Sequence, residues 1–343
     1  MAFTIAPFAV EHLDPAAHLL AARHQASRLC APDLPPQYED PAAARGVVQD
    51  LLTEEGMSGV VALREGTLAG FLLGAPWLLA PTHHLAVWVR PRAAQIPFAG
   101  HAVDGSDPGM LYARLYAALA ARWVGDGLVA QYLSLPADGD AVAPWFDLGF
   151  GRFIELGVRG TQPRAEKDVR PGPILEVRRA VASDEEIVQG LMTDLFRSFA
   201  DAPIFMPFLP ETDAERRHYV AEMLADPACP HWLGVVDGRV VGMQVFIEPH
   251  SPHWDLGPLE VPERSVYLQW GCTVPDARGT GIGDALLAHT LRWAGDTGYD
   301  RCVAHYMTAS RAAAFWRGRG FRPLSRWLCR PVDDRRTWAA GQA

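Results

Sequence analysis

Lysine and closely spaced cysteines are nearly absent from this sequence. Lys167 is its only lysine, and its five cysteines lie far apart, without the close pairs that bind structural zinc. This pattern favours reduced thiols, so we expect a cytoplasmic protein with no metal site. The most apolar window, residues 68–89, is broken by prolines and histidines, and no basic segment precedes an apolar run near Met1. We therefore expect neither a signal peptide nor a membrane span.

Positive charge is scarce along most of the chain, whose formal net charge is −9. A nucleic-acid-binding protein would present a basic surface, so we do not expect nucleic acid as a partner. The exception is the window 275–330, in which nine arginines stand against four aspartates. This local excess predicts an anionic ligand. With 49% apolar and 21% charged residues in a chain of 343, the composition is that of a globular protein long enough for two domains.

The most informative motif is the stretch 278–283, Arg-Gly-Thr-Gly-Ile-Gly. It joins a predicted strand at 265–270 to a predicted helix in which apolar residues recur at helical spacing. Bare glycine backbone and the free N–H groups of a first helical turn favour an anion such as phosphate. The stretch is no P-loop, because no Lys-Ser/Thr pair follows it. It also lacks the G-x-G-x-x-G dinucleotide fingerprint, since its glycines are spaced G-x-G-x-G.

Two motifs, in this order, resemble the GNAT superfamily of acyl-CoA-dependent N-acetyltransferases. The first is Arg-x-x-Gly-x-Gly at 278–283, which Val-Pro precedes and a helix follows. The second is Ala-x-x-Phe-Trp-x-x-x-Gly-Phe at 312–321, after a predicted strand at 301–308. The resemblance implies that acetyl-CoA is the acetyl donor. It also implies an α+β fold, with a mixed, mostly antiparallel sheet flanked by helices.

The resemblance further implies which residues hold acetyl-CoA. The pyrophosphate is assigned to the backbone N–H groups of residues 279–284, with Arg278 at the head of the loop, and the pantetheine arm to the backbone of Thr273 and Val274. Arg311 and three neighbouring arginines are candidates for the remaining phosphate. The full set of predicted ligands is Thr273, Val274, Arg278, Gly279, Thr280, Gly281, Ile282, Gly283, Asp284 and Arg311.

Direct acetyl transfer requires a deprotonated amine, a polarised thioester and a proton for the thiolate, but no protein nucleophile. The GNAT family usually supplies this proton from a tyrosine and places an asparagine after the fifth strand. Trp316 and Ala309 occupy these two positions here. The catalytic candidates are instead Tyr306, His305 and Glu248. Strand alternation sends His305 and Tyr306 to opposite faces, so at most one of them points at the cofactor.

Four other residues have side chains that could take part in such chemistry. Ser310 and His250 are further acid or base candidates. Gln269 stands near the place where many GNAT relatives have a glutamate, and an amide is no base. Cys272 has no evident base nearby, so we expect it to be a packing residue.

The sequence repeats itself with a period of about 172 residues. Ordered matches link the two halves: 64–70 with 236–242, 87–91 with 271–275, 122–127 with 292–298, and 141–150 with 312–321. We therefore predict two tandem GNAT-like domains, 1–162 and 174–343, joined by a proline-rich, charged linker at 163–173.

The two copies differ at the glycine loop. Aligned backward from the shared helix, residues 108–113 correspond to 278–283, and Leu111 stands in the place of Gly281. No arginine heads this loop, and about fourteen extra residues are expected within 92–106. We therefore expect a degenerate N-terminal domain and a C-terminal domain that binds acetyl-CoA.

The resemblance implies an acyltransferase that moves acetyl from acetyl-CoA to a primary amine of a small molecule or a protein. The alternative is a non-catalytic acyl-CoA-binding or protein-interaction module, because the usual tyrosine and asparagine are missing. The segment 248–263 is acidic, and we expect its acids, with Glu211 and Asp213, to attract a cationic amine. We expect a monomer or homodimer that uses no metal and contacts no membrane.

Overall fold

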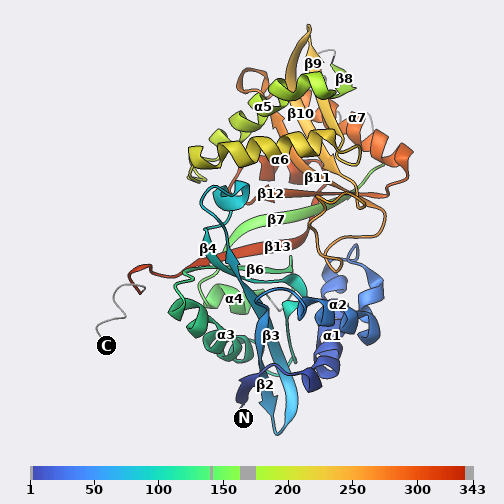
Figure 1. The fold of residues 1–343 in the computed structure, drawn as a ribbon. Helices are drawn as coiled ribbons and strands as arrows, with labels where there is room; N and C mark the ends of the chain where they lie inside the picture. The colour runs from blue at the N-terminus through green and yellow to red at the C-terminus, as the bar shows by residue number, and fades with distance from the viewer. Residues whose placement is uncertain (1–2, 140–141, 163–174, 337–343) are drawn as a thin grey trace.

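The computed structural model describes residues 3–139, 142–162 and 175–336, which form two lobes joined side by side (Figure 1). The predicted linker, 163–173, lies outside the described residues. Each lobe is an α+β unit in which helices cover a mixed sheet, as expected from the sequence. The described helices include none long and apolar enough to cross a membrane.

The main elements of the N-terminal half are β1 (Thr4–Pro7), α1 (Leu13–Cys30), α2 (Pro41–Leu51), β2 (Ser58–Arg64), β3 (Thr67–Leu78), β4 (Arg92–Ile96), β5 (His101–Val103), α3 (Pro108–Gly125), β6 (Ala130–Pro136), α4 (Ala143–Asp147) and β7 (Gly151–Gly160). Those of the C-terminal half are β8 (Glu176–Arg179), α5 (Glu185–Ser198), α6 (Asp213–Ala225), β9 (His231–Val236), β10 (Arg239–Ile247), β11 (Ser265–Thr273), α7 (Ile282–Thr297), β12 (Arg301–Met307), α8 (Arg311–Gly318) and β13 (Arg322–Pro331).

The two halves exchange their last strands. The strand order through the sheet is β1-β2-β3-β4-β6-β13-β7-β12-β11-β10-β9-β8, with β5 paired to β3. Strand β7 of the N-terminal half pairs with β12, and β13 of the C-terminal half pairs with β6. The two exchanged strands also pair with each other, so one continuous sheet crosses both lobes (Figure 1). Each lobe therefore depends on a strand from the other half, which the sequence did not predict.

The repeat predicted the two hairpins correctly. The acidic-glycine pairs Glu65-Gly66 and Asp237-Gly238 all have positive φ, between 49° and 81°, as a tight type I′ turn requires. They join β2 to β3 and β9 to β10. The match of residues 87–91 with 271–275 is wrong, because 84–87 form a short 3₁₀ helix ahead of β4.

The expected insertion within 92–106 is absent for the same reason. These residues form β4 and β5, which pair with successive parts of β3 just as β11 pairs with β10. Together they are the counterpart of β11, broken at Pro97 by a one-turn 3₁₀ helix. In the sequence, the apolar run at 87–91 resembles a strand more closely than this interrupted strand does. The repeat was therefore matched at the wrong residues.

Helices cover both faces of the C-terminal sheet, and the strand alternation divides its core. Met243, Val245 and Val303 point toward α5 and α6. Phe246, Leu268 and Ala304 point toward α7 and α8. This division decides which side chains of β11 and β12 face each helical layer.

Candidate active site

Strands β11 and β12 are parallel neighbours that separate partway along their length. Their pairing runs from Ser265 and Arg301 to Leu268 and Ala304, and then stops. On the other edge of β11, Val245 pairs with Trp270 and Phe246 with Leu268, so Gln269 is an extra, bulged residue. A bulge bends its strand and increases the local twist. Beyond Leu268, the backbone groups of β11 on the β12 side therefore face an opening instead of a partner strand.

The glycine loop lies just beyond the end of β11. Gly279 and Gly281 have φ of +79° and +94°, a region that residues with a Cβ rarely adopt. Gly281 is the N-cap of α7 and offers no side chain to the helix. The first N–H groups of α7 are thus left without a side-chain cap, as an anion site requires. Arg278 donates from Nε to the carbonyl oxygen of Thr273, 3.0 Å away, and so ties the loop to the end of β11.

Two further features fix the start of α7 against α8. A Cβ at Gly283 would lie 3.2 Å from the Phe315 ring, closer than ordinary van der Waals contact, so the ring would have to shift slightly. Asp284 forms an ion pair with Arg319, whose guanidinium lies 4.3 Å from the centre of the Phe315 ring. These contacts hold the loop in one position.

The arginines proposed for the remaining phosphate are mostly engaged in ion pairs. Arg317 pairs with Glu155 and Arg322 with Asp33, in addition to the pair formed by Arg319. Arg311, at the start of α8, is exposed. The local arginine excess therefore serves largely to join the two halves, since Glu155 and Asp33 belong to the N-terminal half.

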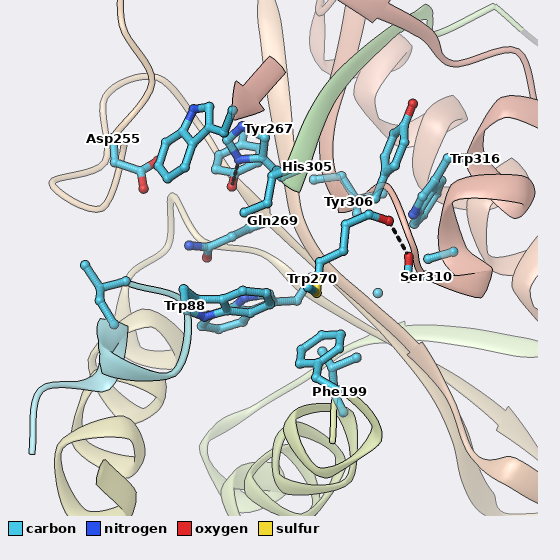
Figure 2. A pocket seen from close by; sticks show the side chains of 18 of the residues that line it. Trp88, Phe199, Asp255, Tyr267, Gln269, Trp270, His305, Tyr306, Ser310 and Trp316 are labelled. Atoms are coloured by element: carbon cyan, nitrogen blue, oxygen red, sulfur yellow. Dashed lines mark hydrogen bonds between the residues drawn. The ribbon is translucent and has the colours of Figure 1, made fainter. Parts of the chain in front are cut away.

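A cavity of about 180 Å³ lies at the opening between β11 and β12 (Figure 2). Trp316 and Ala312 of α8 line one side, and Leu195 of α5 with Phe199, which follows α5, line the other. The cavity therefore connects the α7/α8 face of the sheet with the α5/α6 face. The N-terminal half contributes lining residues as well, which are Trp77, Leu85, Trp88, Val89 and Ile154.

His305 faces the α5/α6 side of this cavity, as Figure 2 shows. Its Nδ1 lies 2.9 Å from the hydroxyl oxygen of Tyr267. The surrounding protein removes water from the imidazole, which lowers the pKa of His305 to about 4. The ring is thus neutral near pH 7. Within the described part of the chain, its Nε2 has no hydrogen-bond partner.

Asp255 lies at the opposite edge of the cavity from Trp316 (Figure 2). Asp255 is an exposed residue, but the protein around its carboxylate removes part of the water that would hydrate it. This desolvation raises the pKa of Asp255 to about 6. The sequence marked Asp255 only as one member of an acidic segment, because a loop residue has no periodicity that would place it.

Tyr306 faces α8, on the other side of the sheet from His305, which confirms the predicted alternation. Its hydroxyl donates to Oε1 of Glu155 at 2.5 Å. Burial and this neighbouring carboxylate raise the pKa of Tyr306 above its usual range. The Tyr306 proton is therefore held by Glu155. Trp316, 5% exposed, packs against Phe321, so packing accounts for its presence.

The structure does not bring Glu248 to the cavity. Glu248 follows β10, at the end of the sheet where β11 and β12 begin, and accepts a hydrogen bond from the Tyr299 hydroxyl at 2.6 Å. The opening lies at the other ends of these strands. Burial raises the pKa of the Cys272 thiol to about 12, as suits a packing residue. Ser310 does line the cavity, and its hydroxyl donates to the carbonyl of Met307.

In the N-terminal lobe, α3 corresponds to α7 but begins in a different way. Aligning Trp123 with Trp293 places residues 108–111, the first turn of α3, opposite the loop 278–281. Asp107 caps this helix by accepting from the N–H of Met110 at 3.1 Å, and Pro108 has no N–H to offer. Leu111 is fully buried beneath the helix and does not project at a ligand. The extra helical turn, not the Leu111 side chain, replaces the glycine loop.

The strand position that faces the cavity is also changed in the N-terminal lobe. Aligning Phe150 with Phe321 places Ser134 opposite His305. Ser134 donates from Oγ to Oε1 of Glu260 at 2.5 Å, and Glu260 comes from the loop between β10 and β11. Leu259 and Glu260 are 1% and 8% exposed. A loop of the C-terminal half thus packs against the corresponding position of the N-terminal lobe.

Comparison with known proteins agrees with this geometry. Residues 192–321 match the acetyltransferase (GNAT) family, a range that runs from α5 through the Gly-Phe turn after α8. The matched range lies within the C-terminal half, and it confirms the resemblance to the GNAT superfamily seen in the sequence. No curated protein matches the sequence.

Two solved structures with TM-scores above 0.5 share the fold at low sequence identity. A GCN5-related N-acetyltransferase from Sphaerobacter thermophilus aligns with a TM-score of 0.56 and 15% identity, over 98% of both chains. The glucosamine N-acetyltransferase region of a fungal multi-domain GH3 β-N-acetylglucosaminidase aligns with a TM-score of 0.55 and 14% identity, over 96% of this chain and 38% of that one. A tandem GNAT protein from the clavulanic acid biosynthesis pathway has a TM-score of 0.46 and 14% identity, over 97% of this chain and 99% of that one.

Proposed function

We propose that this protein is an acetyl-CoA-dependent N-acetyltransferase that transfers acetyl to a primary amine by direct attack in its C-terminal lobe. One observation carries the proposal. The uncapped start of α7 and its glycine loop follow the same strand, β11, whose separation from β12 opens the cavity. Strand β11 thus borders the cavity and leads directly to the proposed anion site.

In this proposal the pyrophosphate binds the N–H groups of residues 279–284, and the pantetheine arm follows the backbone of Thr273 and Val274 into the opening. Each contact of a negative group with a helix N-terminus is worth about 0.3–1 kcal/mol, so several together give useful affinity. Arg278 orients the loop by holding the carbonyl of Thr273. The N-terminal lobe binds no acetyl-CoA, because its own Asp107 already caps the equivalent helix.

The amine approaches from the α5/α6 face, where His305 and Asp255 lie. The bound ammonium group first releases one proton to water. The nitrogen of the neutral amine then forms a bond to the thioester carbon while the carbon–sulfur bond breaks, and the second proton passes to the Asp255 carboxylate. Neutral His305 accepts a hydrogen bond from the amine and orients it. Unpaired backbone N–H groups of β11 beyond Leu268 polarise the thioester carbonyl. We assign no acid role to Tyr306, and water protonates the thiolate.

The test is thiol release from acetyl-CoA by the purified full chain in the presence of primary amines, with the acetylated amine identified by mass spectrometry. Thiol release that depends on the amine, with one acetyl group on the product, is the expected result. Tight acetyl-CoA binding without transfer to any amine would favour the alternative, a non-catalytic acyl-CoA-binding module. A chain that does not bind acetyl-CoA would refute both readings.

A further inference from the structure

The walls of the cavity are unusually aromatic, and their rings come from both halves of the chain. Five of these rings matter for the argument below: Trp77 and Trp88 of the N-terminal half, Phe199 just after α5, Trp270 of β11 and Trp327 of β13. All five are half-buried, so each keeps part of its surface toward open space. The exchange of strands is what brings Trp327 here, because β13 lies between β6 and β7.

Contacts among these rings hold the walls in place. Trp88 lies 4.9 Å from Phe199 between ring centres, and Trp77 lies 6.1 Å from Trp327 in an edge-on contact. Trp327 also contacts the His305 ring, 5.8 Å away. Such offset and edge-on pairs add about 0.5–1.5 kcal/mol each beyond burial, so the aromatic walls are preorganised. A flat apolar group would find ring surface on several sides.

Charge is nearly absent from this cavity. Among its described lining residues, Asp255 is the one that carries charge near neutral pH, since His305 is neutral. A second cavity, of about 300 Å³, shares Trp77, Asp255 and Trp327 with the first. Asp255 therefore lies where the two spaces meet, with aromatic surface on either side. An ion pair beside this much apolar surface is worth more than one in bulk water.

We propose that the acetyl acceptor is an arylalkylamine: its ammonium group pairs with Asp255 before losing its proton, and its aromatic ring packs among the tryptophans that both lobes supply. This inference rests on the proposed function and specifies its substrate class. The N-terminal lobe then has a role in acceptor recognition, through Trp77 and Trp88, although it binds no cofactor. A polyhydroxylated amine would leave its hydroxyls unpaired against these rings, which costs binding free energy.

The experiment compares amines that differ only in the ring. Steady-state thiol release is measured with the full chain for 2-phenylethylamine and tryptamine against n-butylamine, spermidine and glucosamine. We expect kcat/KM for the arylalkylamines to exceed that for n-butylamine by about tenfold or more, which one or two aromatic contacts supply. A preference for spermidine would overturn the proposal and point to the acids of the second cavity, Glu54 and Glu260, as anchors. A preference for glucosamine would also overturn it.

Variants separate recognition from folding. Asp255→Asn is expected to raise KM for tryptamine at least about tenfold, and Trp88→Phe, which keeps a ring, to raise it less than Trp88→Ala. Asp237→Asn, in the exposed β9–β10 turn, is the matched control and should change nothing. An Asp255→Asn enzyme with an unchanged KM would refute the anchor.

A binding measurement distinguishes failure of this inference from failure of the proposed function. The cavity holds several tryptophans, so 2-phenylethylamine should change the intrinsic fluorescence of the chain even without acetyl-CoA, and Asp255→Asn should abolish the change. Amine binding without acetyl-CoA binding would contradict the proposed function but support the amine site. Acetyl-CoA binding without arylalkylamine binding would sink the substrate class alone.

Discussion

In the N-terminal lobe, α3 begins one turn earlier than α7 does in the C-terminal lobe, and that turn occupies the place of the glycine loop. The earlier helix has a proline at its first position and an aspartate as its cap, while the later one starts from Gly281 without a side-chain cap. A capped helix start is stable by itself, whereas an uncapped one leaves N–H groups for a ligand. The N-terminal repeat thus has the fold without the glycine loop and the uncapped helix start.

The lobes also differ in what fills the space beside the fifth strand. In the C-terminal lobe this space is a cavity that His305 faces; in the N-terminal lobe Ser134, at the equivalent position, binds Glu260 from the other half. The same loop that carries Glu260 also carries Asp255 into the cavity. We therefore propose that the N-terminal lobe acts as a scaffold for part of the proposed site in the C-terminal lobe. The predictions below test this division of labour.

The largest expected effect follows from separating the lobes. Residues 163–343 expressed alone would lack β7 beside β12 and would leave β13 without either of its partner strands. We expect no cooperative unfolding transition by circular dichroism, because long unpaired strand edges and exposed cores remain. Co-expression with residues 1–162 should restore the fold. A folded fragment that binds acetyl-CoA would show that the exchange is dispensable.

A pH profile tests the acceptor side of the C-terminal lobe. Because the pKa of Asp255 is raised to about 6, kcat/KM for an amine should fall as the pH drops below 6 and the carboxylate gains its proton. Asp255→Asn should remove this step and lower activity throughout. The raised pKa also means that the folded state favours the protonated form, so the contribution of Asp255 to stability declines as the pH rises from about 4 to 6. An unaltered profile in the variant would contradict the assignment.

The N-terminal helix cap should matter for stability but not for binding. Asp107→Ala removes the carboxylate that accepts from Met110 and should cost about 1 kcal/mol in the free energy of unfolding, measured by urea denaturation. Asp107→Ser, which can still cap, should cost less. The affinity for acetyl-CoA should stay the same in both variants. A weaker affinity would indicate that the N-terminal lobe takes part in cofactor binding.

The smallest effect is expected at Cys272. Its thiol is surrounded by protein and its pKa is raised to about 12, so it supplies no thiolate near neutral pH. Cys272→Ala should retain activity within about twofold, because direct transfer needs no protein nucleophile. Loss of activity in a folded Cys272→Ala protein, with trapping of an acetylated cysteine in the wild type, would replace direct transfer by a two-step mechanism.

Local motifs made much of the C-terminal site predictable. The glycines at 279 and 281 predicted a turn before a helix, and both have positive φ. The acidic-glycine pairs predicted the two hairpins. The alternation of His305 and Tyr306 needed only the period of a strand. The range of the family match, 192–321, covers both motifs.

Features set by long-range contacts were missed. The local sequence of β7 does not show whether it pairs with β6 of its own half or with β12 of the other half. Either pairing would bury the same faces of β7. Glu248 looked available from its position after a strand, but Tyr299 binds it at the far end of the sheet. Asp255 reaches the cavity because the loop between β10 and β11 packs against the other lobe, which the sequence around it does not indicate. The 3₁₀ turn after Pro97 divides the counterpart of β11 into β4 and β5, so this strand was not recognised from the repeat.

The most direct test of the account counts acetyl-CoA sites. Calorimetric titration should give one site per chain, lost or weakened about a hundredfold in Gly281→Asp, where a carboxylate faces the phosphates. Gly281→Asn is the matched control, since asparagine tolerates the same left-handed φ and adds no charge, and it should bind more tightly than the aspartate variant. Two sites in the wild type, or equal affinities in the two variants, would contradict a single competent lobe with its phosphate site at α7.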